Sequence, residues 1–230
     1  MEIYHVYNRG VDKRQVFMDD SDRIRFVHDL YEFNDEERTN SNFVAFQGTQ
    51  RRYQDIGCPD IGRVSHVRDL LVHIHAWCLM GNHYHLMLSE VKEGGMAKFM
   101  KKLSMGYAKY FNEKYERSGA LWQGKYKRIL LDRDCHFQYL PFYIHLNPLD
   151  MSFPEWREGK LKNSKKALKK LEQYRWSSHL DYLGSKNFPS VIHSALLNKV
   201  FNETTNYKRC VELHIQDLTW RQDVTGITFE

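Results

Sequence analysis

Two histidines separated by a single residue, His83 and His85, are the first side chains whose type and spacing suggest chemistry. They lie in an apolar run with the character of a strand, where a period of two directs both imidazoles to the same face. Such a pair can chelate one metal ion. Because His-x-His also occurs in ordinary strands, and the chain has a second case in His73 and His75, either pair alone favours a structural role.

A second feature is the helical pattern around Tyr143 and Asn147. These two residues are four positions apart, so the phenol and the carboxamide lie one above the other on a helix face. A nucleophile and a metal ligand can therefore meet at one place. A tyrosine on an apolar helix is most often a packing residue, so this pattern needs independent support.

The N-terminal part of the chain predicts one strand, one helix and an irregular segment. Residues 3–7 alternate in the manner of a strand, and residues 8–10, Asn-Arg-Gly, predict a turn. Residues 19–21 offer N-cap side chains for a helix that runs to about Phe33. Residues 34–68 are polar and irregular and predict no element.

The middle of the chain predicts a hairpin, a helix, a strand and a further helix. Strand-like runs at 70–79 and 83–88 are joined by Gly81-Asn82, a pair that suits a tight turn. The next elements are a long basic helix that ends before Gly119 and a strand at 126–131. A further helix runs from Asp132 or Asp134 to Asn147, where Pro148 ends it, and Pro141 within it implies a kink or two shorter helices. This order predicts an α+β sandwich, with helices packed on a largely antiparallel sheet.

The hairpin register decides which histidines share a face. If residues 81–82 form a two-residue turn, Met80 faces His83, and Cys78 faces His85 across the ladder. The opposite face then carries His73, His75 and Trp77. On this register the two pairs cannot bind one ion together, whereas a shift by one residue would reverse the faces.

Positive charge is concentrated in two segments, although the formal net charge is only +5. Residues 97–133 contain ten Lys or Arg against three Asp or Glu, and residues 160–175 contain seven against one. Either run alone is typical of a solvated helix face. Two such runs in one chain, interleaved with Tyr and Trp, favour a polyanionic partner.

Length and composition indicate one main globular domain, with 230 residues of which 42% are hydrophobic. No run approaches the roughly 18 apolar residues of a membrane-spanning helix, and the first residues lack the blocks of a signal peptide. We therefore expect a soluble, cytoplasmic protein with no membrane partner. We also expect reduced, structural thiols, because no Cys-x-x-Cys pair occurs among Cys58, Cys78, Cys135 and Cys210.

Five separated motifs give the chain a family resemblance that covers roughly residues 3–180. The chain resembles the single-tyrosine HUH transposases, and more closely their REP-associated branch, which is linked to repetitive extragenic palindromes. The motifs are Tyr4-His5-Val6-Tyr7-Asn8-Arg9-Gly10, Trp77-Cys78-Leu79-Met80-Gly81-Asn82-His83-Tyr84-His85-Leu86, Gly119-Ala120-Leu121-Trp122-Gln123-Gly124-Lys125-Tyr126-Lys127, Tyr143-Ile144-His145-Leu146-Asn147-Pro148 and Tyr174-Arg175-Trp176-Ser177-Ser178. Any one of them would be a weak signal, but their occurrence in the family's order is specific.

The resemblance implies a ferredoxin-like core with the two histidines on a central strand. It assigns His83 and His85 as metal ligands, Tyr143 as the nucleophile and Asn147 as the third ligand, where some insertion-sequence relatives carry Gln. The implied cofactor is Mg²⁺ or Mn²⁺. The implied reaction cleaves and rejoins single-stranded or hairpin DNA through a 5′-phosphotyrosine.

We expect residues 1–150 to form the nuclease core and residues 151–230 a basic, helical C-terminal extension, in a monomer or homodimer. The side chains expected to contact DNA are Arg9, Lys13, Arg14, Trp122, Lys125, Lys127 and Arg128, although Trp122 is equally suited to the core. Two alternatives remain open. One is an inactive hairpin-binding protein of the same fold, and the other is a metal-dependent phosphodiesterase that uses activated water.

Overall fold

Four antiparallel strands form the central sheet of the computed structural model, in the order β2-β3-β1-β4. The structure describes residues 1–36, 68–158, 161–201 and 204–216. The strands are β1 (Ile3–Arg9), β2 (Val72–Leu79), β3 (His83–Glu90) and β4 (Lys127–Leu130). β1 and β3 are the inner strands, so a side chain on either has neighbours on both sides.

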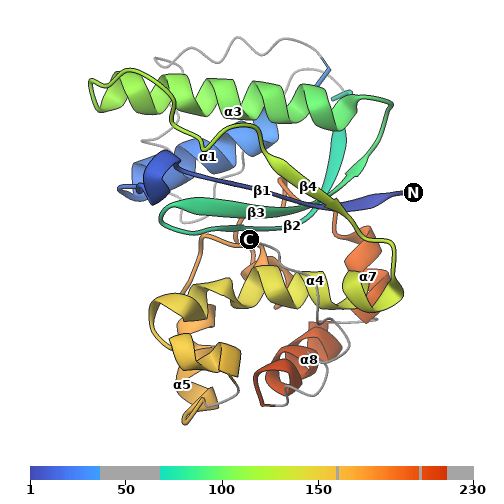
Figure 1. Cartoon of the computed structure of the whole chain (residues 1–230). Helices are drawn as coiled ribbons and strands as arrows, with labels where there is room; N and C mark the ends of the chain where they lie inside the picture. Colours follow the sequence, from blue (N-terminus) through green and yellow to red (C-terminus); the bar gives the residue numbers. More distant parts are fainter. Residues whose placement is uncertain (37–67, 159–160, 202–203, 217–230) are drawn as a thin grey trace.

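Helices α1 (Asp20–Glu32) and α3 (Gly95–Lys114) cover one face of the sheet (Figure 1). Asp19 caps α1 with a reciprocal capping box to Asp22, as its position after an extended segment predicts. The apolar faces of both helices pack onto Val6, Tyr84 and the other β-strand residues of that face in one buried cluster. This cluster packs one face of the sheet against α1 and α3. The opposite face of the sheet carries the candidate site.

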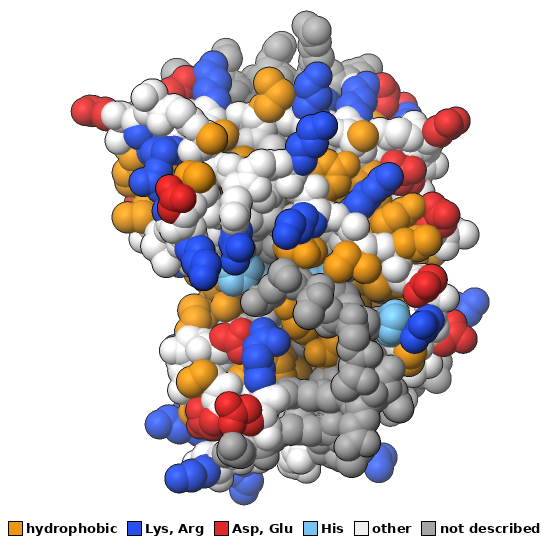
Figure 2. Space-filling model, in the orientation of Figure 1, with side chains coloured by type: hydrophobic (Ala, Val, Ile, Leu, Met, Phe, Trp, Pro, Cys, Tyr) orange, Lys and Arg blue, Asp and Glu red, His pale blue; other side chains and the backbone are white. Residues whose placement is uncertain are grey.

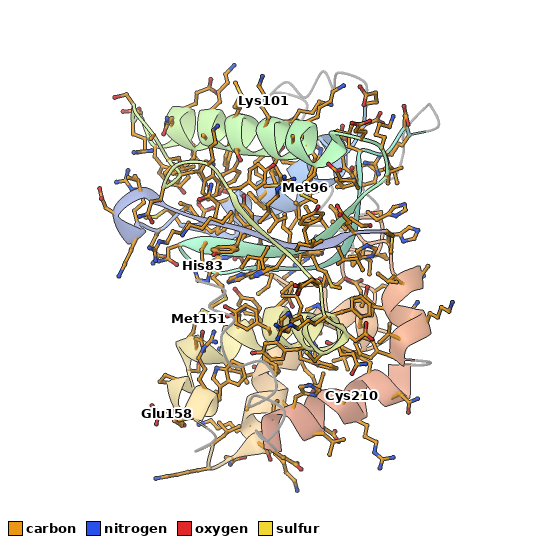
Figure 3. All side chains as sticks on the ribbon, turned by 45° about the vertical axis from the view of Figure 1, so that its right-hand side comes forward. His83, Met96, Lys101, Met151, Glu158 and Cys210 are labelled. Atoms are coloured by element: carbon orange, nitrogen blue, oxygen red, sulfur yellow. The ribbon has the colours of Figure 1, made fainter. Side chains whose placement is uncertain are left out.

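The second face is covered by α4 (Asp134–Leu146) and by the helices that follow it (Figure 1). Their buried side chains join Ala76, Cys78 and Met87 of the sheet in a second cluster. The elements after α4 are the 3₁₀ turns η2 (Asn147–Met151) and η3 (Pro154–Glu158) and the helices α5 (Ser164–Glu172), α6 (His179–Tyr182), α7 (Ala195–Phe201) and α8 (Thr204–Gln216). Figure 3 shows His83 at the sheet, with Met151 and Glu158 in the helical layer beneath it.

The observed order β1-α1-β2-β3-α3-β4 confirms the predicted α+β sandwich. Two β-α-β units interleave, so that the first strand lies between the third and the fourth, which is the ferredoxin-like arrangement. Strand β1 is two residues longer than expected, because Asn8 and Arg9 pair with β3 instead of turning. The irregular segment 34–68 lies almost wholly outside the described residues.

The predicted hairpin register is correct near the turn, where Cys78 pairs with His85 and Trp77 faces the other side. The prediction for His73 and His75 is wrong. A β-bulge at His75 shifts the register between Ile74 and Ala76, so His73 pairs with Ser89 on the face that also carries His85. The two histidine pairs therefore share a face of the sheet. They are well separated along it, because Ser89, the partner of His73, lies four residues beyond His85 on β3, a distance of about 13 Å.

Pro141 does not divide the helix that precedes Asn147 into two, which was one of the two predicted alternatives. Pro141 lies inside α4, which is continuous from Asp134 to Leu146 and is packed into the second cluster over its last seven residues. The α-helix ends at Leu146, within one residue of the predicted Asn147, and Pro148 lies in the first turn of the 3₁₀ helix η2 that follows, where a missing N–H costs nothing. The residue at the N-cap of α4 is Arg133, without a side-chain capping bond.

The sequence also predicts that the chain has no membrane-spanning helix and that its cysteines are reduced. Within the described residues, no helix combines the length and apolar character needed to cross a bilayer. The described cysteines, Cys78, Cys135 and Cys210, are free thiols, and Cys58 lies outside the described residues.

Candidate functional site

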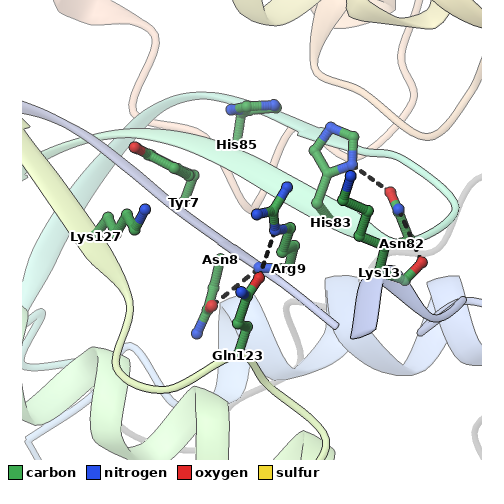
Figure 4. Close-up of a pocket in the computed structure, with 9 residues that line it drawn as sticks. All are labelled: Tyr7, Asn8, Arg9, Lys13, Asn82, His83, His85, Gln123 and Lys127. Atoms are coloured by element: carbon green, nitrogen blue, oxygen red, sulfur yellow. Dashed lines mark hydrogen bonds between the residues drawn. The ribbon is translucent and has the colours of Figure 1, made fainter. Parts of the chain in front are cut away.

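His83 and His85 project from β3 on the face that α4 covers. Their ring centroids are 4.9 Å apart and the rings are nearly perpendicular, at 87°. His83 is half-buried and His85 is 1% exposed. Both imidazoles line a cavity of about 330 Å³ at the end of the sheet where β1 meets the hairpin turn (Figure 4).

Each imidazole has a hydrogen-bond partner at Nδ1. His83 Nδ1 lies 2.6 Å from Asn82 Oδ1, and His85 Nδ1 lies 2.9 Å from His5 Nε2. The Nε2 atom of His85 is buried and makes no hydrogen bond to any described residue. This atom is the kind of orphaned buried nitrogen that a metal ion or a substrate can satisfy.

Burial keeps His5 and His85 neutral. Desolvation lowers the pKa of His85 well below its usual range, and electrostatic interactions with His5, His83 and Arg157 lower it further. Desolvation alone lowers the pKa of His5 to about 3. At neutral pH both rings therefore carry one proton and one lone pair, which is the state that binds metals.

The predicted nucleophile lies against the histidines. Tyr143 on α4 is 4% exposed, and its ring makes edge contacts with His85 at 5.4 Å and with His5 at 5.7 Å between centroids. The guanidinium of Arg157 lies 5.4 Å from the centre of the same ring. The structure thus brings Tyr143 and His85 together from two elements that are far apart in the sequence.

Asn147 is close to Tyr143 but has other partners. Its Nδ2 donates to the Tyr143 carbonyl at 2.9 Å, and its Oδ1 accepts from Arg157 Nη2 at 2.7 Å. Arg157 also donates from Nε to Asp150 at 2.8 Å, which fixes its plane. The Asn147 side chain is fully buried and does not line the cavity.

Three of the predicted DNA contacts line the cavity with the histidines. They are Arg9, Lys13 and Lys127, and Figure 4 shows their side chains around the same opening. Lys127 shares the face of His85, because it pairs with Tyr7, which itself pairs with His85. The cavity therefore combines imidazole nitrogens with three cations.

The other predicted DNA contacts do not line this cavity. Arg14 and Lys125 are exposed, and Arg128 points to the α1 and α3 face, with its guanidinium 5.4 Å from the Tyr4 ring. Trp122 takes the core alternative: it is 7% exposed, packs among Phe26, Tyr84 and Tyr107, and donates from Nε1 to the Ser104 carbonyl at 3.1 Å. Figure 2 shows Lys and Arg side chains spread over the upper half of one face, several of them directly above a histidine at the waist.

Sequence reasoning missed several residues of the site. Gln123 lines the cavity and accepts from Arg9 Nε at 2.5 Å, and Asn8 accepts from the Arg9 backbone N–H at 2.9 Å. His5 could have been found from the period of two, since it alternates with Tyr7 on the face of β1 that meets His85. Arg157 carried no signal, because it lies in a short 3₁₀ turn outside every motif.

The donor set fits a divalent ion of the borderline type, since imidazole nitrogen and amide oxygen suit Mn²⁺ and its neighbours. In the part of the chain that the structure describes, no group of three or more His, Cys, Asp or Glu side chains is arranged as a metal site. Of the predicted ligands, His83 and His85 line the cavity, whereas the amide oxygen of Asn147 accepts from Arg157 and Asn147 does not line it.

Residues 65–147 match the family model described as "Transposase IS200 like". This segment is therefore similar to the IS200-like transposases. It contains the His-x-His pair of β3, and it ends at Asn147, so all four residues predicted to carry the chemistry lie inside the IS200-like region.

No curated protein matches the chain. Among solved structures the chain is similar to one described as "Structure of the REP associates tyrosine transposase bound to a REP hairpin", with 11% identity, 82% of each chain covered and a TM-score of 0.41.

Proposed function

We propose that this IS200-like protein is a metal-dependent endonuclease and strand transferase that acts on single-stranded DNA through Tyr143. The observation that supports this most directly is the contact between the Tyr143 ring and His85, at 5.4 Å, within the segment that matches the family. A phenol that contacts an imidazole, where that imidazole lines a cationic cavity, suits phosphoryl transfer better than a packing role.

The reaction exchanges one phosphate ester for another. Tyr143 Oη attacks the phosphorus, the bond to the 3′ oxygen breaks, the phenol proton passes to solvent, and the departing oxygen takes up a proton. The products are a 5′-phosphotyrosine and a free 3′-hydroxyl. Because the new ester retains the energy of the old one, a 3′-hydroxyl can reverse the step and join strands.

The chain's own residues hold and orient the substrate. His83 and His85, with Asn147 as the third ligand, would hold Mg²⁺ or Mn²⁺, which when bound offsets the charge of a phosphate oxygen. Arg9, Lys13 and Lys127 attract the phosphates of the flanking nucleotides into the cavity. Tyr143 is only 4% exposed, so bulk water has little access to this side chain.

The preferred substrate is a hairpin with a single-stranded flank. Support comes from the sequence motifs of the REP-associated branch and from the cavity itself, where Tyr7 offers a half-buried ring for stacking beside cations. Duplex DNA cannot splay a strand into such a cavity without unpairing.

The test is a labelled hairpin oligonucleotide incubated with the protein and Mn²⁺, followed by denaturing electrophoresis. A band that stays attached to protein after denaturation, and that disappears with EDTA, supports the proposal. Cleavage without an attached band would indicate a phosphodiesterase that uses water. Tight binding without cleavage would indicate an inactive hairpin-binding protein, and either result overturns the tyrosine mechanism.

A further inference from the structure

The two imidazoles of the His-x-His pair are held in the same way, from residues that lie outside the pair. In each ring the Nδ1 atom has a polar partner, Asn82 for His83 and His5 for His85. In each ring Nε2 is then the atom left to serve the cavity that both side chains line. This common arrangement is the pattern that orients histidine ligands in metal sites.

For His83 the proton position follows from the neighbouring amide. Asn82 Nδ2 donates to the Lys13 carbonyl at 3.1 Å, which fixes Oδ1 as the atom that faces His83. An amide oxygen can only accept, so His83 Nδ1 carries the proton and Nε2 carries the lone pair.

For His85 the partner is a second imidazole. One of the two facing atoms, His85 Nδ1 and His5 Nε2, must donate and the other must accept. If His5 donated, the proton of His85 would sit on Nε2 and no lone pair would face the cavity. Either choice places one proton on a buried nitrogen without a described hydrogen-bond acceptor, His85 Nε2 in one case and His5 Nδ1 in the other. If His85 donates, Nε2 presents a lone pair to the cavity, matching His83.

His5 is itself fixed in place. Its side chain is fully buried on the inner strand β1, stacks on Tyr7 at 5.0 Å, and touches the edge of Tyr143 at 5.7 Å. The ring cannot rotate without displacing these neighbours. It can therefore set the orientation of His85 as well as its tautomer.

We propose that His5 is a positioning residue of the cleavage site: its Nε2 accepts the Nδ1 proton of His85 and holds His85 with the Nε2 lone pair toward the cavity. The metal-binding part of this role rests on the proposed function. The choice of tautomer rests on it too, but the tautomer can be measured in the protein without metal or DNA.

The first experiment measures that tautomer directly. Long-range ¹H–¹⁵N spectra of the metal-free protein distinguish a protonated Nδ1 from a protonated Nε2 in each histidine. We expect both His83 and His85 to be protonated at Nδ1. A proton on His85 Nε2 in the wild-type protein would overturn the inference.

The second experiment titrates Mn²⁺ into the protein without DNA, by calorimetry or electron paramagnetic resonance. His5→Phe keeps a ring but removes the acceptor, so we expect Mn²⁺ affinity to fall about 10- to 100-fold. His5→Gln restores an acceptor at a similar reach, and we expect it to recover most of the affinity. Equal affinity in wild type and His5→Phe would contradict the role.

A matched control is His75→Phe. His75 is also buried in the sheet and bonds to the Ser89 hydroxyl at 2.8 Å, but it lies far from the cavity. We expect its Mn²⁺ affinity to equal that of wild type. If His5→Phe does not fold, the comparison of His5→Gln with wild type and the tautomer measurement still decide the inference.

Failure of the proposed function gives a different result. If His85→Ala binds Mn²⁺ as well as wild type does, the metal assignment is wrong whatever His5 does. If His85→Ala loses binding while His5→Phe retains it, the metal site stands and the role of His5 is refuted.

Discussion

Arg157 Nη2 donates a hydrogen bond to the Asn147 amide oxygen at 2.7 Å. The other end of the same amide donates to the carbonyl of Tyr143 at 2.9 Å. One carboxamide therefore connects the end of α4, the helix of Tyr143, to η3. A fully buried amide with both ends bonded is expensive to remove, whatever else it does.

Asn147→Ala should therefore affect both stability and chemistry. Losing the two hydrogen bonds should lower the free energy of unfolding by about 1–3 kcal/mol, measured in urea. Cleavage should fall less than in His83→Ala or His85→Ala, because a neutral amide oxygen is the weaker ligand. A change in cleavage larger than that of either histidine variant would contradict this ranking.

The control for this prediction is Asn163→Ala. Asn163 accepts from the Lys166 backbone N–H at 2.9 Å as the N-cap of α5. Its loss should cost about 1 kcal/mol of stability and leave cleavage unchanged. The pair separates a catalytic effect from simple destabilisation.

Tyr143→Phe should abolish cleavage and the covalent adduct while hairpin affinity stays within a few-fold of wild type. The variant removes one hydroxyl and keeps the ring that packs on His85. Denaturing gels and binding isotherms measure the two effects. Full activity would point to Tyr139, whose ring lies 5.9 Å from that of Tyr143, whereas Tyr107 is buried on the other side of the sheet and bonded to the Val16 carbonyl.

The two histidine pairs should respond differently to substitution. His83→Ala or His85→Ala should sharply reduce metal-dependent cleavage. His73→Ala should change stability more than chemistry, because His73 stacks on His193 at 3.8 Å, away from the cavity. If His73→Ala loses Mn²⁺ binding and the His83 and His85 variants do not, the metal binds near His73, away from Tyr143, and the proposed mechanism is contradicted.

Replacing Arg9, Lys13 and Lys127 together by Ala should weaken binding to every DNA sequence tested. If each cation neutralises one phosphate of a single strand, the slope of log affinity against log salt should flatten by about two units. The control triple Lys165, Lys169 and Lys170→Ala removes exposed cations from α5, outside the cavity. If the control flattens the slope and the cavity triple does not, the DNA path follows α5 instead.

The parts of the candidate site that could be predicted are those whose residues recur at a regular spacing in the sequence. The period of two identified His83 and His85, the helical period joined Tyr143 to Asn147, and the element order gave the sheet. The bulge at His75 could not be predicted, because one inserted residue leaves no mark on residue types but reverses the face of His73. Arg157 could not be predicted either, since its contacts depend on how a short 3₁₀ turn folds back onto α4.

Stability should fall as the solution is acidified below pH 6.5, because several histidines are buried in neutral form. Burial lowers the pKa of His5 to about 3 and those of His75 and His179 to about 4. The unfolded chain binds these protons near pH 6.5, and the folded chain does so only at the lower values, so the stabilisation is complete above pH 6.5 and is lost as pH falls toward 3–4. Urea unfolding between pH 7 and 4 should show a decline of up to about 1.4 kcal/mol per pH unit for each such histidine. His179→Gln should reduce the decline, and an equally steep decline in that variant would mean that His179 is not the neutral, buried group described above.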